Sequence, residues 1–208
     1  MRWAHCCFIA LVTGAFAVEP LEEYDGDRSG RKTRYPSPDG RYAMLITYDE
    51  EPENDQVEII ELATQRVVAL LSDPEVVTDR SSSAKLDWSP DSQRVAAYTG
   101  GRRGGSVQLF RREGKELKEV KLPKLPELPE EPTAAAAKKH HWKAIKVVTV
   151  ADLEFVRWLK DGVLLELSNF FSGESGSFGW NIELTITVDA KGKAKLTKVK
   201  KTEVFDDN

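Results

Sequence analysis

A few residues have side chains and spacings that could do chemistry. His140 and His141 are adjacent and precede Trp142, and Asp152 and Glu154 lie two positions apart. Neighbouring residues of a helix or strand point in different directions, so we expect the histidine pair to lie in a solvated loop rather than chelate one metal ion. Two carboxylates at a suitable separation can act as general acid and base, so a hydrolase would use Asp152 and Glu154.

Two further segments imitate ion-binding loops. Asp25 to Gly30 places oxygen ligands at positions one, three and five and glycine at six, but Pro36 stands where a calcium loop needs its bidentate glutamate. We therefore favour a flexible loop. Gly100 to Gly105 could present amides and guanidinium groups to an anion, although a mobile hairpin tip is favoured. No residue is assigned a catalytic, cofactor-binding or metal-binding role, and no cofactor is expected.

The composition bounds the class of protein. The 208 residues are 40% hydrophobic, and 30 Lys and Arg against 34 Asp and Glu leave a net charge of −4. Such a chain can bury a core, and its nearly balanced charge argues against a nucleic-acid partner. It has no run of about 18 apolar residues, so no membrane span is expected.

The first residues have the order of charge, apolar run and small residues that is typical of a signal peptide, residues 1–17. Arg2 precedes the apolar run Trp3 to Val12, and Ala15-Phe16-Ala17 forms the cleavage site. A buried N-terminal helix or strand is the alternative. Val18 follows the cleavage point, so no lipid anchor is expected, and the location is predicted to be periplasmic or extracellular. The segment contains both cysteines of the chain, Cys6 and Cys7.

A turn motif recurs along the chain. Pro36 to Ala43 is repeated as Trp88 to Ala96 after 52 residues, and a weaker copy, Trp158 to Leu164, follows after another 70. Proline presets the backbone angle and aspartate or serine caps the turn, so each copy should reverse one strand into the next. The turn carboxylates are therefore expected to be structural: Asp39, Asp91 and Asp161.

Short β-prone runs with turn residues between them predict an all-β domain of about a dozen strands. The clearest hairpin reverses at Asp189 to Gly192, where apolar and polar residues alternate on the strand before it. The predicted strands, apart from the one before each turn, are 42–48, 56–62, 66–71, 94–98, 106–111, 117–121, 163–167, 180–188 and 194–200.

The repeated turn, its apolar strand and a Val57 to Thr64 strand end resemble the TolB-type β-propeller repeat, a relative in architecture of WD repeats. The resemblance implies four-stranded blades, an exported location and a role in holding other molecules. Pro36 replaces the usual tryptophan, and the third copy lacks Ser-Pro. We predict a partial or open β-propeller of about three four-stranded antiparallel blades. An open arc on a partner, two chains completing a ring of about six blades, and a compact sandwich all remain open.

The predicted organisation has a flexible acidic lead-in at 18–34, a β-repeat domain at 35–202 and a polar tail at 203–208. The domain carries an insertion at 123–142, in which proline recurs at every third position, the period of polyproline II. It could dock in an aromatic-lined groove, but a surface segment held over a sheet by its leucines is favoured, with a short helix at 134–137. The leucines are Leu122, Leu125 and Leu128.

Charge patterning and the absence of a catalytic signature lead to the functional expectation. Lysines alternate along the last predicted strand as on the wetted face of an edge strand, and acidic residues fill 49–55, so the first and last copies would attract. We expect an exported, non-catalytic β-propeller-like module that binds a protein or glycan, with a homodimer left open. A secreted hydrolase using Asp152 and Glu154 is the alternative.

Overall fold

The computed structural model describes residues 30–48, 56–71, 83–101, 104–141, 143, 150–173 and 176–207. Within these ranges the chain forms three four-stranded antiparallel sheets and one short helix, α2, Ala134–Lys139. None of the helices in this part of the chain has the length and apolar character to cross a bilayer. The predicted signal peptide, the calcium-like start at Asp25 and the acidic stretch 49–55 lie outside the described residues.

Each sheet is a meander in which strands that follow one another in the sequence are hydrogen-bonded neighbours. The first sheet contains β1 Gly30–Arg34, β2 Tyr42–Tyr48, β3 Gln56–Glu61 and β4 Arg66–Leu70. The second contains β5 Ser83–Trp88, β6 Arg94–Gly101, β7 Gly104–Glu113 and β8 Glu116–Val120. The third contains β9 Val150–Leu159, β10 Gly162–Gly173, β11 Gly176–Val188 and β12 Ala194–Asp207.

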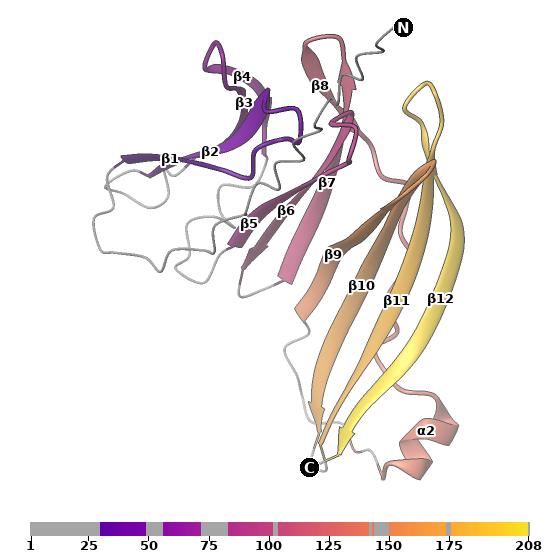
Figure 1. The fold of residues 1–208 in the computed structure, drawn as a ribbon. Coiled ribbons are helices and arrows are strands. Elements are labelled where there is room, and N and C mark those ends of the chain that lie inside the picture. Colours follow the sequence, from indigo (N-terminus) through magenta and orange to yellow (C-terminus); the bar gives the residue numbers. More distant parts are fainter. Residues whose placement is uncertain are drawn as a thin grey trace, which may run out of the picture.

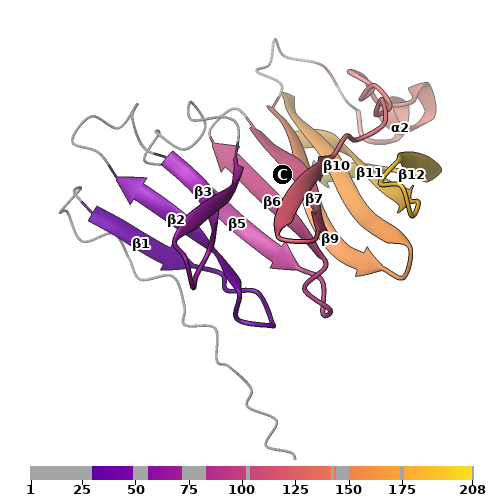
Figure 2. The same cartoon turned by 90° about the horizontal axis from the view of Figure 1, so that it is seen from above.

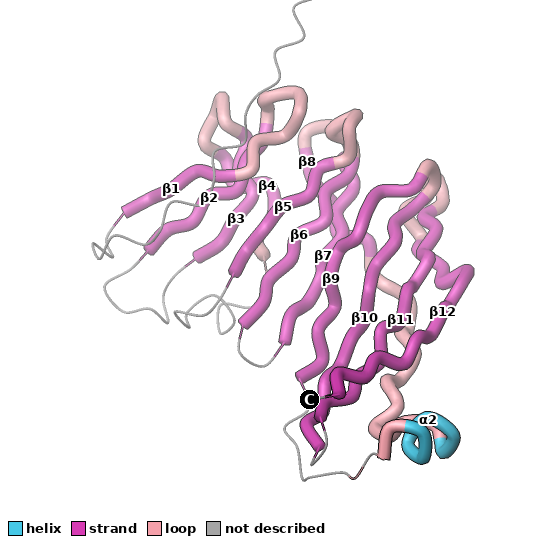
Figure 3. The backbone as a smooth tube through the Cα atoms, turned by 60° about the horizontal axis from the view of Figure 1, so that its bottom comes forward, coloured by secondary structure: helices cyan, strands magenta, loops and turns pink. Residues whose placement is uncertain are grey.

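The sheets lie side by side in chain order as an open stack (Figure 1). Seen from above, β1 lies at one end of the row and β12 at the other (Figure 2), and the backbone tube shows the same order (Figure 3). The predicted all-β class, with three blade-like four-stranded sheets in an open arrangement, is confirmed.

Two apolar cores hold the stack together, one on each side of the second sheet. The core toward the first sheet is formed by Tyr42, Met44, Ile46, Val57, Ile59, Leu71, Leu86, Val95, Ala97, Phe110 and Leu117. The core toward the third sheet includes Ala96, Val107 and Leu109 from the second sheet and Leu153, Leu165 and Leu184 from the third. Because β6 and β7 present apolar side chains alternately to both cores, the second sheet is buried on two faces.

The strands at the two ends of the stack extend past the predicted limits. β1 lies in the predicted flexible lead-in 18–34, and β12 runs to Asp207, past the predicted strand end at 200 and into the predicted polar tail 203–208. All but the last side chain of β1 are exposed, so this strand has no apolar alternation by which to recognise it. The end of β12 pairs with the start of β11, and Phe205 packs on the core there.

The proline-rich segment, residues 122–133, covers part of the third sheet. Its three leucines pack on the core between the second and third sheets, as favoured from the sequence. Asn169 Nδ2 donates to the Pro129 carbonyl at 3.0 Å, and Trp180 Nε1 donates to the Glu131 carbonyl at 3.3 Å. Figure 1 shows the segment passing behind the third sheet on its way from β8 to α2. The segment therefore covers a part of the core-facing side of the third sheet that the second sheet does not cover.

The short helix ends the segment and corrects the expectation for the histidines. Thr133 caps α2 by accepting from the Ala136 N–H at 3.3 Å, and its own N–H donates to Glu203 at 2.6 Å. His140 is the C-cap residue, and its ring stacks on Phe205 with centroids 4.1 Å apart. His140 therefore packs against β12 instead of lying in a solvated loop, while His141 is exposed.

Candidate functional site

The first two turns of the repeat have the same backbone structure. In each, the serine N–H donates to the carbonyl five positions later at 2.8 Å, and the residue three positions later donates back to the serine carbonyl at 2.8 Å. These serines are Ser37 and Ser89. The returning residues, Gly40 and Ser92, have φ of 67° and 56°. Glycine suits this left-handed position, and Ser92 adopts it as a non-glycine exception.

Both turn carboxylates are held by hydrogen-bond donors. Ser37 Oγ donates to Asp39 Oδ1 at 2.7 Å, and Ser89 Oγ donates to Asp91 Oδ1 at 2.6 Å. The serine hydroxyl and then a backbone N–H hold the pKa of Asp91 below its usual value. Partial burial acts to raise the pKa of Asp39, but the hydrogen bonds it accepts and the charge of Arg112 outweigh burial and lower it. These two carboxylates are structural, as predicted.

The third turn reverses the chain by different means. It links Leu159 to Gly162, which are paired across β9 and β10, through the two residues Lys160 and Asp161. A Cβ at Gly162 would collide with the Ile186 carbonyl, so glycine is required there. Asp161 has no serine two positions before it, so the carboxylate clamp of the first two turns is absent from the sequence of the third.

The first strands of the second and third sheets, β5 and β9, each carry a tryptophan near their end that hydrogen-bonds to the sheet before. Trp88 Nε1 donates to the Tyr35 carbonyl at 2.9 Å, and Trp158 Nε1 donates to the Asp87 carbonyl at 3.1 Å. Tyr35 and Asp87 occupy the same position of the repeat, directly before the turn motif. The repeat detected in the sequence is therefore also a repeat of inter-sheet contacts.

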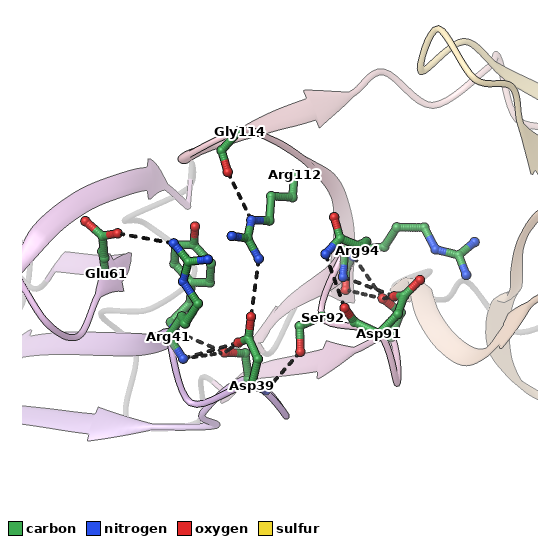
Figure 4. A network of polar contacts seen from close by, with 12 residues as sticks. Asp39, Arg41, Glu61, Asp91, Ser92, Arg94, Arg112 and Gly114 are labelled. Carbon is green, nitrogen blue, oxygen red and sulfur yellow. Dashed lines mark hydrogen bonds and ion pairs between the residues drawn. The ribbon is translucent and has the colours of Figure 1, made fainter.

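Arginine links the first turn to the second sheet (Figure 4). Arg112 Nη1 donates to Asp39 Oδ2 at 3.2 Å, its Nε donates to the Gly114 carbonyl at 3.0 Å, and its guanidinium lies 5.4 Å from the centroid of the Tyr42 ring. The Asp39 N–H also donates to Ser92 Oγ at 3.0 Å. Asp39 thus binds its own turn and the next sheet at once.

The second and third sheets are also linked by an arginine. Here the arginine belongs to the earlier of the two sheets, whereas Arg112 belongs to the later sheet of its pair. Arg94 Nη1 donates at 3.4 Å to three carbonyls around the third turn, and its guanidinium lies 4.9 Å from the centroid of the Trp158 ring. Arg112 and Val188 occupy equivalent positions in their sheets. The Arg112 N–H donates to the Gln93 carbonyl and the Val188 N–H donates to the Asp161 carbonyl, at the same place in the two turns. Valine cannot reach back to Asp91 as Arg112 reaches to Asp39.

A charged face ends the stack. One cross-strand pair recurs at the same place in each sheet: Ile46 with Val57, Tyr98 with Val107, and Glu166 with Glu183. Val57 and Val107 are buried in the two cores, and Ile46 and Tyr98 pack there with them. In the third sheet the equivalent face instead carries two glutamates, which are only half-buried.

Three glutamates and a lysine form a row across this face. Glu154 is opposite Glu166, Glu166 is opposite Glu183, and Glu183 is opposite Lys200, whose Nζ lies 3.2 Å from Glu183 Oε1. We call Glu154, Glu166 and Glu183 the acidic row. Like charges on directly opposite residues repel, so the row is a local cost to the fold.

Asp152 lies beside the acidic row and contacts the second sheet. Tyr98 Oη donates to its two carboxylate oxygens at 3.3 and 3.4 Å. Burial first, and then the charge of Asp152 and a hydrogen bond with it, raise the pKa of Glu154. The two carboxyl groups that a hydrolase would use are therefore in direct contact. Glycosidase carboxyls that flank a bond stand about 5 Å or more apart.

The glycines near Tyr98 have a packing role. Gly100 and Gly105 are paired at the ends of β6 and β7. A Cβ at Gly100 would collide with the Tyr98 ring, and one at Gly105 would collide with the same ring and with Asp152. The predicted hairpin tip thus begins beyond two paired glycines that let Tyr98 reach Asp152. Arg102 and Arg103 lie outside the described residues.

The remaining predicted residues are placed as follows. β12 is an edge strand, as its alternating lysines indicated. Within the described ranges, no group of three or more His, Cys, Asp or Glu side chains is arranged to hold a metal ion. Sequence reasoning singled out Glu154 of the row, but not Glu166, Glu183, Arg94 or Arg112. The signal for the row was charge at positions where the matching strands of the first two copies are apolar.

Comparison with protein-family models gives no matching family, and comparison with curated proteins gives no matching relative.

Proposed function

We propose that the protein is an exported, non-catalytic binding module of the TolB-type, β-propeller-like class, which holds a protein partner on the acidic face of its third sheet. The observation that carries this proposal is the Glu166–Glu183 pair at a position where the first two sheets bury apolar side chains. The signal-peptide pattern at 1–17 supports export to the periplasm or the extracellular space.

The charge of the acidic face supports a binding surface over a face that only ends the stack in water. Neutral polar residues such as Thr185 and Thr187, which lie on the same face, would suffice to end a stack in water. Glutamates on opposite residues cost stability instead, and a cationic partner would relieve that repulsion. Phe170, which is 54% exposed on this face, would add apolar contact. A protein surface with cationic side chains suits the row better than a neutral glycan does.

The alternative is a secreted hydrolase that uses Asp152 and Glu154. The raised pKa of Glu154 favours it, because a general acid must keep its proton near neutral pH. The direct contact between the two carboxyls counts against a glycosidase, since it leaves no space for a glycosidic bond between them. Activity on any ester or glycoside that disappears in both Asp152→Asn and Glu154→Gln would establish the hydrolase.

Site-specific photo-crosslinking in the native envelope tests the binding module. A photoreactive residue at Thr185, on the acidic face, should give a discrete adduct, whereas one at the exposed Lys121 should not. The adduct at 185 should fall at least about tenfold when Glu166→Gln and Glu183→Gln are combined. Equal labelling at both positions, or an adduct that survives loss of the two charges, would contradict the proposal.

A further inference from the structure

We infer that the partner on the acidic face is an extended protein segment that lies along β10 and β11 and carries a lysine or arginine and, four residues from it, an apolar side chain. The inference rests on the proposed function and names the chemistry and spacing of the partner. It comes from three observations: the order of side chains on this face, the length of the third sheet, and the support that the sheet receives on its other side.

The acidic face changes in character along its strands. Directly paired residues of β10, β11 and β12 lie on the same side of the sheet, and successive rows on that side are two residues apart. Toward the C-terminal end of β10 the rows are Glu166, Glu183 and Lys200, then Ser168, Asn181 and Thr202, then Phe170, Gly179 and Val204. The face thus passes from charged through neutral polar to apolar within four residues of each strand.

The apolar row offers two exposed side chains to a partner. Phe170 is 54% exposed, and Val204 is 44% exposed. A Cβ at Gly179, which is paired with both, would collide with the Asn169 carbonyl, so glycine is required there. An apolar side chain of the partner would be buried against Phe170 and Val204.

The apolar row lies on an extension of the third sheet that has no counterpart in the described strands of the other two. β2 ends two residues after Ile46, and β6 ends three residues after Tyr98, which are the residues equivalent to Glu166. β10 instead continues for seven residues after Glu166, to Gly173. Packing against the second sheet does not account for this length, because the second sheet does not cover the extension.

The extension is held in place from the side opposite the acidic face. Asn169 and Trp180 donate to carbonyls of the proline-rich segment, and Glu203 accepts from the N–H and hydroxyl of Thr133 at the end of that segment. The chain therefore uses a dedicated segment to support a piece of sheet whose other side carries exposed apolar side chains. A surface that is fixed before binding loses little conformational entropy when a partner binds.

The distance between the charged and apolar rows matches an extended partner. Strand residues rise about 3.3 Å each, so rows four residues apart are separated by about 13 Å. Side chains four residues apart on a partner strand have the same separation and point to the same side, whereas four residues of α-helix span about 6 Å. The partner's cation faces Glu166 and Glu183 rather than β12, where Lys198 and Lys200 on the same face repel it.

Binding of two dye-labelled β-hairpin peptides to the purified chain, followed by fluorescence anisotropy, tests the inference. Both hairpins are closed by a disulfide and have the same composition. One carries an arginine and a leucine four residues apart on one strand, and the other carries them three residues apart, hence on opposite sides. The first should bind at least about tenfold more tightly, because only the first can contact both rows at once.

Variants of the apolar row locate the second contact. Phe170→Thr with Val204→Thr should remove the advantage of the first hairpin. Val67→Thr with Leu70→Thr, on β4, is the matched control, because these side chains are 43% and 61% exposed, and it should preserve the advantage. Near-ultraviolet circular dichroism checks the fold, and Phe170→Thr alone replaces the double variant if the latter unfolds.

The outcomes separate this inference from the proposed function. Equal affinity of the two hairpins, no binding of the first at about 1 mM, or an advantage that survives Phe170→Thr with Val204→Thr would overturn the extended segment. If the crosslink at Thr185 still depends on Glu166 and Glu183 in that case, the binding module stands with a partner of another shape. A crosslink that does not depend on the two charges would overturn the proposed function and this inference with it.

Discussion

The carboxylates of the first two turns and those of the third sheet are the same chemical groups in opposite surroundings. Asp39 and Asp91 each accept one hydrogen bond from a serine hydroxyl and one from a backbone N–H, and Asp39 accepts another from Arg112. Glu154 and Glu166 face other carboxylates. The pKa is lowered at Asp39 and Asp91 and raised at Glu154. Ionisation of Asp39 and Asp91 therefore stabilises the fold, whereas ionisation of Glu154 opposes it.

This difference follows from where each group lies in the stack. The first two turns are followed by another sheet, so their polar groups serve to lock one sheet to the next. The acidic face has no following sheet within the described part of the chain. Its side chains are not committed to a contact between sheets, and in the proposed function they would bind a partner at a cost in stability that the turns do not carry.

Removal of the Asp39 carboxylate should have the largest effect on this comparison. Asp39→Ala removes three accepted hydrogen bonds, one of them from Arg112, so we expect a loss of about 2 kcal/mol in the free energy of unfolding after allowance for partial exposure. Asp91→Ala, which has no arginine from the next sheet, should lose about 1 kcal/mol. Denaturant unfolding measures both.

Asp161→Ala is the control from the third turn, where the serine is missing. It should change the unfolding midpoint little. If Asp161→Ala destabilises the protein as much as Asp91→Ala, the turn clamps are not what separates the first two copies from the third.

Removal of the Arg94 guanidinium should have the next largest effect. Arg94→Met keeps the apolar stem but loses the bonds to three carbonyls and the contact with the Trp158 ring. We expect a loss of about 1 kcal/mol, because the three bonds are long and share one nitrogen. Arg41→Met, at a side chain that is 45% exposed, is the matched control and should have little effect.

The sequence predicted the parts of the fold that depend on local chemistry. Proline at the second turn position and aspartate after it act within a few residues, so the turns at Asp39 and Asp91 could be recognised as equivalent. Alternation in β11 marked Ile182 and Leu184 as inward-facing before any register was known. β1 was not recognised as a strand because its side chains are polar or charged and show no alternation of apolar and polar residues.

Contacts between sheets could not be read from the sequence in the same way. Arg112 and Asp39 are 73 residues apart, and Trp88 bonds a carbonyl 53 residues before it. Only the recurrence of tryptophan at positions 88 and 158 hinted at such a link. The acidic row needed the register, because its meaning depends on Glu166 and Glu183 replacing pairs that the other sheets bury.

Neutralising the acidic row should stabilise the monomer slightly. Glu166→Gln removes the middle charge and with it the repulsion from both neighbours, so we expect a gain of about 0.5 kcal/mol. Unfolding is measured at a protein concentration low enough for monomers. Glu127→Gln, on the proline-rich segment, should leave the stability unchanged. A loss of stability in Glu166→Gln would mean that the row is satisfied within the chain.

The smallest expected effect concerns pH: acidification should first raise and then lower the free energy of unfolding. The folded-state pKa of Asp39 and Asp91 lies below the ordinary 3.8, so their contribution is complete above that value and is lost as the pH falls through the folded pKa. The folded-state pKa of Glu154 lies above the ordinary 4.5, so its ionisation opposes folding at neutral pH. That penalty disappears as the pH falls from the raised pKa toward 4.5.

Stability should therefore rise slightly on mild acidification and fall below about pH 4. Denaturant unfolding between about pH 3 and 8 would separate the two regions through their variants. Glu154→Gln should abolish the rise, because it removes the carboxyl that binds its proton more readily in the folded than in the unfolded state. Asp39→Asn should make the acid fall smaller, because residue 39 then binds no proton in either state and only the contribution of Asp91 remains. If Glu154→Gln leaves the rise intact, the repulsion at the acidic face is not its source, and the contrast between turns and face would rest on geometry alone.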